Sequence, residues 1–354
     1  METRSSAPLR AIVVGLGRIG FGYHCPEIAR SPHFELVGVV DPLPERRAEA
    51  EALWRTRSAG SLAPLLRETH PDLVVIASPT PFHAEHARAA FAHGAHVFCD
   101  KPVARTVAEF DPMLAAARAA GRSLVAYQKR RFLPEIRALG DLLARGVLGP
   151  VHLIRRHYSG YVRRADWQVF RAHGGGLLNN YGSHCLDEIL WLLGDDPVRD
   201  VHCRVRRVAT AGDADDFVKC LLGTARGVLV DLEISQATAL AGPPWEVLGA
   251  HGAARWDEEK HHWQVRHYLP TEAPPLAAQP GLAAAGRLYA TESLPWREFS
   301  VPGPADNPHD YYTALWRHLA RGEPPPVTPD DSRRLLELLE RCHASAATEP
   351  PPTA

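Results

Sequence analysis

The sequence predicts an α/β fold in two parts: a parallel, doubly wound sheet, then an α+β domain built on a large, mostly antiparallel open sheet. Up to residue 126, short apolar runs alternate with segments of helical spacing, which is the pattern of β-α-β units. Beyond it, longer segments alternate apolar and polar residues, as in antiparallel strands with one exposed face. We therefore place the domains at 1–126 and 127–345, and we expect a disordered tail at 346–354.

The elements of the first half follow from these two periodicities. The predicted strands are Leu9–Val14, Leu36–Val40, Leu73–Ala77, Val97–Cys99 and Leu124–Ala126, and the predicted helices are Pro44–Arg55, Leu62–Glu68, Phe82–His93 and Val107–Ala120. The helix after the first strand contains Gly22 and Pro26, and proline inside a helix removes a hydrogen bond and clashes with the preceding turn. We expect that helix to be broken, or to begin late with Pro26 in its first turn.

The second half is predicted in the same way. Its strands are Val151–Tyr158, Asp200–Val208, Phe217–Leu222, Val228–Ile234 and Trp263–Leu269, and its helices are Glu135–Arg145, Asn180–Leu193, His309–Ala320 and Ser332–His343. Residues 270–308 hold much of the proline and show little periodicity. That composition predicts long irregular loops.

Composition and charge exclude several classes of function. Forty Lys and Arg against 41 Asp and Glu leave a net charge of −1, which gives no general attraction to nucleic acid or to anionic membranes. We see neither a signal-peptide pattern nor an apolar stretch of membrane-spanning length. The six cysteines include no C-x-x-C pair, so we expect reduced thiols and a cytoplasmic location. The histidine clusters lack the companion ligands of a zinc site, and we expect no metal.

A glycine-rich turn predicts a dinucleotide site. Residues 15–20 read Gly-Leu-Gly-Arg-Ile-Gly and directly follow the first strand, which is the Rossmann fingerprint in the context that it requires. Gly15 permits the tight turn and Gly17 lets a pyrophosphate approach the backbone. Gly20 allows the helix to pack closely on the strand.

The acid that such a site needs is also present. Asp41 stands 21 residues after Gly20, at the end of the second strand, where a carboxylate can accept hydrogen bonds from the ribose hydroxyls. A 2′-phosphate would meet like charge there, so NAD is favoured over NADP. Arg46 and Arg47 follow closely and keep NADP open as a second cofactor.

Further motifs resemble one enzyme family. Asp100-Lys101-Pro102 follows the fourth strand and Thr80-Pro81-Phe82-His83 precedes it, Arg131–Pro134 opens the second half, and a glycine-rich stretch at 174–184 leads to His184 and then Asp187. Together they resemble the Gfo/Idh/MocA family of NAD(P)-dependent oxidoreductases, which includes glucose-fructose oxidoreductase and inositol dehydrogenase. The resemblance covers nearly the whole chain. Two positions depart from it, because the family usually has Glu in place of Asp100 and Asp in place of Asn180.

The residue types support this resemblance. Lys101 lies past the end of the fourth strand, the edge where ligands bind in open α/β sheets, and its cation can stabilise a substrate alkoxide. His184 has a reference pKa of about 6.5, which suits proton transfer. Asn180 lies four residues before His184 and on the same helix face, but it supplies no negative charge. The structural alternatives are a turn lysine, a core histidine and, for Asn180, a helix cap.

We assign site residues from the fingerprint, the resemblance and the residue chemistry. The catalytic residues are Lys101, His184 and Asn180; the cofactor residues are Gly15, Gly17, Arg18, Ile19, Gly20, Asp41, Ser78, Thr80, His83, Asp100 and Lys101; the substrate residues are Lys101, Tyr127, Arg131, Tyr161, Trp167, Asn180 and His184. Aromatic rings can stack on sugar faces, and Arg131 can bind oxygens. Ordinary packing or surface roles are the alternative for Tyr127, Arg131, Tyr161 and Trp167, and a simple helix start is the alternative for His83.

The resemblance implies a function. It implies hydride transfer between a nicotinamide and a secondary alcohol or ketone of a sugar, cyclitol or sugar derivative, with Lys101 polarising the oxygen and His184 handling the proton. One alternative is a redox-neutral, NAD-dependent enzyme that processes glycosides. Another is a non-catalytic regulatory protein that binds the cofactor, which Asn180 suggests. The resemblance also implies a homodimer or homotetramer formed through the outer face of the open sheet.

Overall fold

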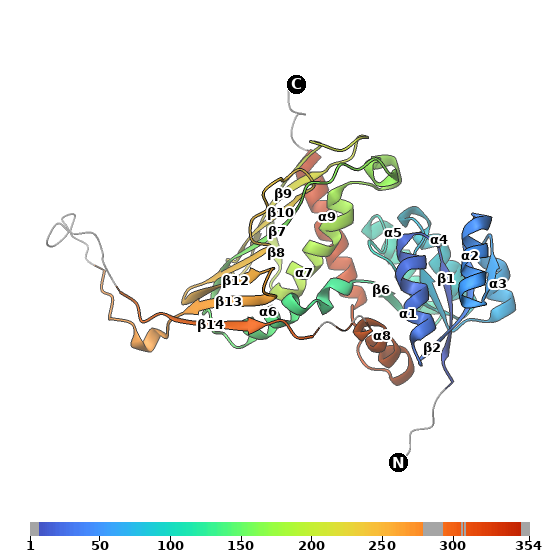
Figure 1. The fold of residues 1–354 in the computed structure, drawn as a ribbon, viewed down its shortest axis with the longest axis horizontal. Coiled ribbons are helices and arrows are strands. Elements are labelled where there is room, and N and C mark those ends of the chain that lie inside the picture. The colour runs from blue at the N-terminus through green and yellow to red at the C-terminus, as the bar shows by residue number, and fades with distance from the viewer. Residues whose placement is uncertain (1–6, 279–292, 306, 308, 348–354) are drawn as a thin grey trace, which may run out of the picture.

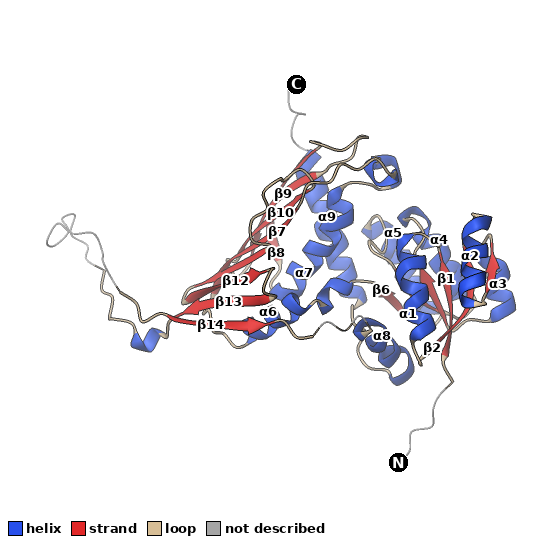
Figure 2. Cartoon of the chain, viewed as in Figure 1, coloured by secondary structure: helices blue, strands red, loops and turns tan. Residues whose placement is uncertain are grey.

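Two sheets organise the molecule, one in each half. A computed structural model of the chain describes residues 7–278, 293–305, 307 and 309–347. The six-stranded sheet and the eight-stranded sheet lie at opposite sides (Figure 1). Between them lie helices α6 (Pro134–Ala144), α7 (Ser183–Leu193) and α9 (Pro329–Ala347). Figure 2 shows that helices also flank the smaller sheet. The predicted α/β fold class is confirmed.

The smaller sheet is parallel throughout, with the order β3-β2-β1-β4-β5-β6. Its strands are β1 Leu9–Val14, β2 Phe34–Val40, β3 Arg57–Ala59, β4 Leu73–Ile76, β5 His96–Cys99 and β6 Leu124–Ala126. Strand order reverses between β1 and β4, and such a switch point opens a crevice at the carboxyl ends of the strands. The strand β3 was not predicted, because it has only three residues and none of them is large and apolar.

The helices of this half agree closely with the predicted ones. They are the π-helix η1 Gly20–His24, α1 Cys25–Arg30, α2 Pro44–Trp54, α3 Leu62–Thr69, the short η2 Thr80–Phe82, α4 His83–Ala92 and α5 Val107–Ala119. The expected break after β1 is confirmed: a π-turn gives way to α1 just before Pro26, which occupies the first turn of α1.

The larger sheet has the order β14-β13-β12-β11-β7-β10-β9-β8. Its strands are β7 Val151–Ser159, β8 Val198–Arg206, β9 Phe217–Thr224, β10 Leu229–Ser235, β11 Trp245–Gly249, β12 Gly252–Asp257, β13 His262–His267 and β14 Arg297–Pro302. Among the described strands of the larger sheet, β7 and β10 form the one parallel pair, so the prediction of a mostly antiparallel sheet is confirmed.

Two predictions for the second half were wrong in part. Residues 270–308 are not wholly irregular, because β14 pairs with β13 along the edge of the sheet. This strand ends at Pro302, and an edge strand tolerates proline because the missing N–H faces away from the ladder. The predicted tail from 346 also begins too early, since α9 continues to Ala347, and residues 348–354 lie outside the described residues.

The second half contains the following helices, of which α6, α7 and α9 lie on one face of the larger sheet (Figure 1). They are the short η3 Lys129–Phe132, α6 Pro134–Ala144, η4 Trp167–Val169, η5 Arg171–His173, the π-helix η6 Leu178–Gly182, α7 Ser183–Leu193, η7 Pro270–Glu272, α8 Asp310–Arg321 and α9 Pro329–Ala347. The predicted helix Asn180–Leu193 therefore consists of a π-turn followed by α7. No helix among the described residues has the length and apolar character needed to span a bilayer.

Helix α8 returns to the first half of the molecule (Figure 1). Tyr312 of α8 lies beside His24, whose Nδ1 is 2.8 Å from the Tyr312 hydroxyl, and the rings of Trp316 and His33 stack with centroids 3.8 Å apart. His24 is fully buried, and its Nε2 has no hydrogen-bond partner among the described residues. Burial lowers the pKa of His24 from 6.5 to about 3.

We expect His24 to make the protein less stable in acid. Because its folded pKa is depressed, the unfolded chain takes up the proton first, and stability falls as pH drops below about 6.5. From pH 7 to pH 5 this difference in proton uptake lowers the free energy of unfolding by about 2 kcal/mol. Urea unfolding at both pH values should show that His24→Gln loses this part of the pH dependence. His173→Gln, at an exposed position, is the control and should retain it. Equal pH dependence in all three proteins would contradict the assignment.

Candidate active site

The glycine turn after β1 has the shape that a dinucleotide needs. Gly15 has a φ of +93°, and its N–H donates to the carbonyl of Val40 at 2.7 Å. A Cβ on Gly20 would lie 1.8 Å from the carbonyl oxygen of Gly15, so helix and turn touch there. A Cβ on Gly17 would meet nothing within 4 Å, and Gly17 lines a cleft. The open space beside Gly17 fits the close approach of a pyrophosphate to the backbone.

Two alanine substitutions should separate these roles. Gly17→Ala should leave stability unchanged but place a methyl group where the pyrophosphate would approach, raising the Kd for NAD by about tenfold or more. Gly20→Ala forces the backbone apart and should cost about 3 kcal/mol of unfolding free energy. Calorimetric titration with NAD and urea unfolding measure the two effects. Unchanged NAD binding in Gly17→Ala would show that the cofactor does not approach this glycine.

Asp41 closes the other end of this turn. Its carboxylate accepts hydrogen bonds from the N–H groups of Leu16 at 2.8 Å and Leu43 at 3.0 Å. Arg46 lies 3.4 Å from the same carboxylate and lines the cleft, whereas Arg47 donates to the main-chain carbonyl of Asp41. The carboxylate is therefore held in place, and Arg46 is the cation of the two that faces the cofactor space.

Lys101 connects the two halves of the molecule. It follows β5, and its Nζ donates to the side-chain oxygen of Asn180 at 2.7 Å and to the Asn180 carbonyl at 3.0 Å. The Asn180 amide in turn donates to Gln168 Oε1 at 3.0 Å. This second bond fixes the orientation of the amide, so that its oxygen faces the lysine. Burial lowers the pKa of Lys101, although Asp100 opposes the shift.

His184 completes the group. It lies at the start of α7, one helical turn beyond Asn180, and lines the same cleft. Its Nδ1 is buried and has no hydrogen-bond partner among the described residues. Burial, reinforced by the positive charges of Lys101, Arg130 and Arg156, lowers the pKa of His184 well below 6.5. The imidazole is therefore neutral at pH 7.

One cleft joins the glycine turn to this polar group. It has a volume of about 590 Å³. Most of the predicted site residues line it: Gly15, Gly17, Arg18, Ile19, Asp41, Ser78, Thr80, His83, Asp100, Lys101, Trp167, Asn180 and His184. The cleft thus lies between the carboxyl ends of the parallel strands and the glycine-rich stretch of the second half. Such a place suits a cofactor bound face to face with a substrate.

Two protein-family models match this chain. Residues 9–128 match a family model described as "Oxidoreductase family, NAD-binding Rossmann fold", and residues 136–255 match the GFO/IDH/MocA C-terminal domain. The chain belongs to the GFO/IDH/MocA family. It is an oxidoreductase with an NAD-binding Rossmann domain, so the predicted family, enzyme class and cofactor are confirmed.

Individual GFO/IDH/MocA relatives match different lengths of this chain. D-glucoside 3-dehydrogenase of Escherichia coli is 31% identical over 221 residues, which span 60% of this chain and 62% of that protein. D-apiose dehydrogenase of Paraburkholderia graminis is 28% identical over 319 residues, or 88% and 81% of the two chains. A crystal structure of the WlbA dehydrogenase from Bordetella pertussis with NADH and UDP-GlcNAcA shares the fold, with a TM-score of 0.77, 23% identity and coverage of 98% and 97%.

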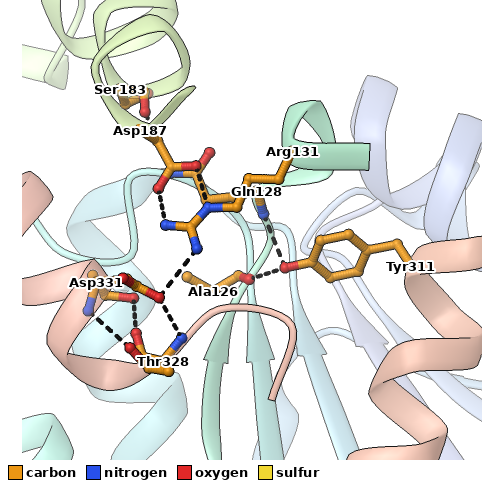
Figure 3. A network of polar contacts seen from close by, with 9 residues as sticks. Ala126, Gln128, Arg131, Ser183, Asp187, Tyr311, Thr328 and Asp331 are labelled. Carbon is orange, nitrogen blue, oxygen red and sulfur yellow. Dashed lines mark hydrogen bonds and ion pairs between the residues drawn. The ribbon is translucent and has the colours of Figure 1, made fainter. Parts of the chain in front are cut away.

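Four predicted site residues of this GFO/IDH/MocA protein do not line the cleft. Gly20 packs against Gly15 beneath it. Tyr127 is buried in an aromatic cluster, with its ring centroid 4.9 Å from that of His24. Arg131 is buried between Asp187 and Asp331 (Figure 3). Tyr161 is 58% exposed and forms an isolated β-bridge with Ala237. In the structure Tyr127 and Arg131 are therefore packed in the interior, and Tyr161 lies at the surface.

His83 holds the loops around the cofactor space. It is buried at the start of α4, with Nε2 2.8 Å from the carbonyl of Ser78 and Nδ1 3.1 Å from the carbonyl of Pro102. One ring therefore joins the loop after β4 to the loop that carries Lys101. Burial lowers the pKa of His83, so the ring is neutral at pH 7 and donates to one of the two carbonyls.

Sequence reasoning missed several residues that line the cleft. Gln168 orients Asn180, and Asn179 donates to the carbonyls of Gly174 and Gly175. Asp166 binds Arg18 at 3.0 Å, which joins the glycine turn to the second half across the cleft. The segment from 163 to 168 is mostly polar, but it has no periodicity that would mark it as a site.

Proposed function

We propose that this protein transfers hydride between a nicotinamide and a secondary alcohol or ketone of a sugar, cyclitol or sugar derivative. The contact between Lys101 and Asn180 carries the proposal, because it brings a cation from the cofactor half against the polar group of the other half. His184 lines the same cleft as both residues. A cation and a neutral imidazole beside one cofactor site are the two groups that alcohol oxidation needs.

Each group has a separate task. A bound nicotinamide supplies the acceptor or donor of hydride at its ring. Lys101 holds the substrate oxygen and stabilises the negative charge that develops on it, replacing its present bond to the Asn180 side chain. His184, neutral at pH 7, takes the hydroxyl proton on a ring nitrogen and returns it in the opposite direction. Asn180, held by Gln168, orients these groups without adding charge.

The lining of the cleft favours a polyhydroxy substrate. Trp167 is 44% exposed and lines the cleft, where its ring can stack on the apolar face of a sugar. Gln168, Asn179 and Arg164 add donors and acceptors around it. The names of two relatives refer to a D-glucoside and to D-apiose, which are sugars or sugar derivatives. These observations support a sugar-type substrate for this chain.

A substrate panel tests the proposal. Purified protein with NAD would be offered methyl D-glucosides, free aldoses and inositols while the absorbance of reduced nicotinamide is followed and products are separated by chromatography. Net reduction of NAD with an oxidised sugar is the expected result. Cleavage of a glucoside without net reduction would favour the redox-neutral alternative. No turnover of any compound, although NAD binds, would count against the proposed substrate class.

The position of Asp41 makes a prediction about cofactor choice. Asp41→Ser removes the charge that opposes a 2′-phosphate and frees Arg46 from its ion pair. We expect the ratio of NADP affinity to NAD affinity to rise by about tenfold to a hundredfold. Each tenfold step corresponds to about 1.4 kcal/mol of binding free energy. Titration of both cofactors measures it, with Arg47→Ala as the comparison, since Arg47 binds main-chain carbonyls. An unchanged ratio would place the ribose elsewhere.

The proposal includes assembly into a homodimer or homotetramer. Leu221 on β9 and Leu229 on β10 are 52% and 60% exposed, although neither strand lies at the edge of the larger sheet. Contact between the outer faces of two such sheets would cover them. Sedimentation equilibrium on the wild type and on a Leu221→Glu/Leu229→Glu variant tests this. A monomeric wild-type protein would exclude it.

A further inference from the structure

A cluster of three thiols lies outside the cleft. Cys203 on β8, Cys220 on β9 and Cys342 on α9 are all buried, and their sulfur atoms lie within 4.8 Å of one another. The Cys220 thiol donates to the sulfur of Cys203 at 3.0 Å. None of the three lines the cleft, and the proposed function uses none of them.

Two of these cysteines stand directly opposite each other on neighbouring antiparallel strands. The register pairs Cys203 with Cys220. The Cys203 N–H bonds to the Ser345 hydroxyl at 2.9 Å, and its carbonyl accepts from its neighbour Arg204, so both groups point away from β9. The two cysteines are therefore a non-hydrogen-bonded pair, whose Cα atoms lie about 4.5 Å apart in such ladders. That spacing falls within the range of about 4.4 to 6.8 Å that disulfides span.

We propose that the thiol cluster is a redox modification site, at which a hydroperoxide converts Cys203 and Cys220 into a reversible disulfide. In the first step the Cys203 thiolate attacks a peroxide oxygen, the O–O bond breaks, and a sulfenic acid and an alcohol or water form. In the second step the Cys220 thiol attacks the oxidised sulfur, the S–O bond breaks, and the departing hydroxide takes the proton of that thiol and leaves as water. Two thiols are oxidised and one hydroperoxide is reduced.

The surroundings single out Cys203 as the nucleophile. Hydrogen bonds from the thiols of Cys220 and Cys342 lower the pKa of Cys203, whereas burial raises the pKa of Cys99 and of Cys185. A thiolate is the form that reacts with peroxide. Cys203 is thus the thiol that these neighbours stabilise as an anion.

The cluster can be reached by local opening. β8 is the last strand of the sheet, and its free edge is covered by side chains of α9, with Arg341 donating to the carbonyls of Val198 at 2.8 Å and Arg199 at 2.7 Å. Side-chain contacts at an edge open at lower cost than a central ladder. Cys342 lies on the same helix, so opening of this edge exposes the third thiol together with the other two. An added dithiol is the reductant that returns the disulfide to two thiols.

Thiol counting on the full-length protein tests the proposal. Reduced protein would be treated with hydrogen peroxide, denatured in guanidinium, alkylated with N-ethylmaleimide and analysed by intact mass and peptide mapping. The chain has six cysteines, so two fewer adducts are expected after oxidation, with one cross-link between the peptides of Cys203 and Cys220 and recovery of all adducts after dithiothreitol. Cys203→Ser should abolish the cross-link. Cys99→Ser, which removes a buried thiol outside the cluster, should retain it.

Several results would overturn the proposal. One is that all six thiols are still alkylated after peroxide treatment that oxidises free glutathione. Another is a cross-link that excludes Cys203, or irreversible oxidation without a cross-link. A stoichiometric copper(I) or zinc ion that protects the three thiols in the purified protein would instead make the cluster a metal site. Because the wild-type peptide map needs no variant, a folding defect in Cys203→Ser leaves the test intact.

Discussion

Replacing Lys101 with methionine should lower kcat by about a thousandfold while leaving the Kd for NAD within about threefold of the wild type. Methionine keeps most of the length of the buried side chain and removes its charge. In the structure the Lys101 Nζ donates to the two oxygens of Asn180. A substrate oxygen in the cleft would take the place of the amide oxygen, and without the cation its developing charge is left in a poorly hydrated site.

The control is Lys129→Met. Lys129 lies over the ring of Tyr23 at 4.7 Å and does not line the cleft, so its removal tests for loss of a lysine in general. Both variants would be assayed on the best substrate of the panel, and NAD binding would be measured by calorimetry. If Lys101→Met kept more than about a tenth of the wild-type kcat, the electrostatic role assigned to Lys101 would be wrong.

The parallel half was predictable because its elements are encoded locally. Every buried strand is a short apolar run, and the one strand that sequence reasoning missed there, β3, is short and carries no apolar run. The larger sheet was harder to predict. β11 and β12 are joined by a two-residue turn at Ala250 and His251, and β14 follows a proline-rich segment. Their pairing partners, rather than their own residues, make them strands.

The candidate site was also predictable only in part. Lys101, Asn180 and His184 were predicted because they belong to motifs that resemble those of the family, and the structure brings all three to one cleft. Gln168 was missed because its role depends on a bond to a residue twelve positions away, across an irregular loop. Arg131 was assigned to substrate from its residue type alone. Its actual partners, Asp187 and Asp331, are 56 and 200 residues distant in the sequence, and no local pattern reveals such a contact.

Arg131→Met should destabilise the protein by about 3 to 5 kcal/mol, the cost of leaving a buried charge unpaired. Figure 3 shows the guanidinium between two carboxylates. It donates to both oxygens of Asp187 at 2.7 Å and to Asp331 at 3.1 Å. Asp331 also accepts from the N–H of Thr328 at the start of α9. One arginine thus joins the end of the first sheet to α7 and α9, and urea unfolding measures its removal.

The matched control is Arg137→Met, which breaks an ion pair of similar length at the surface. Arg137 lies 2.9 Å from Asp310, but their side chains are 46% and 31% exposed, so the loss of unfolding free energy should stay below about 1 kcal/mol.

A double variant, Arg131→Met with Asp187→Leu, separates the effect of the charge from the effect of packing. Asp187 is buried, so removing its carboxylate should recover part of the lost stability, whereas additive losses would assign the effect to packing alone. Under conditions where Arg131→Met is folded, its KM should equal that of the wild type, because Arg131 does not line the cleft; a raised KM would restore the substrate role predicted from the sequence.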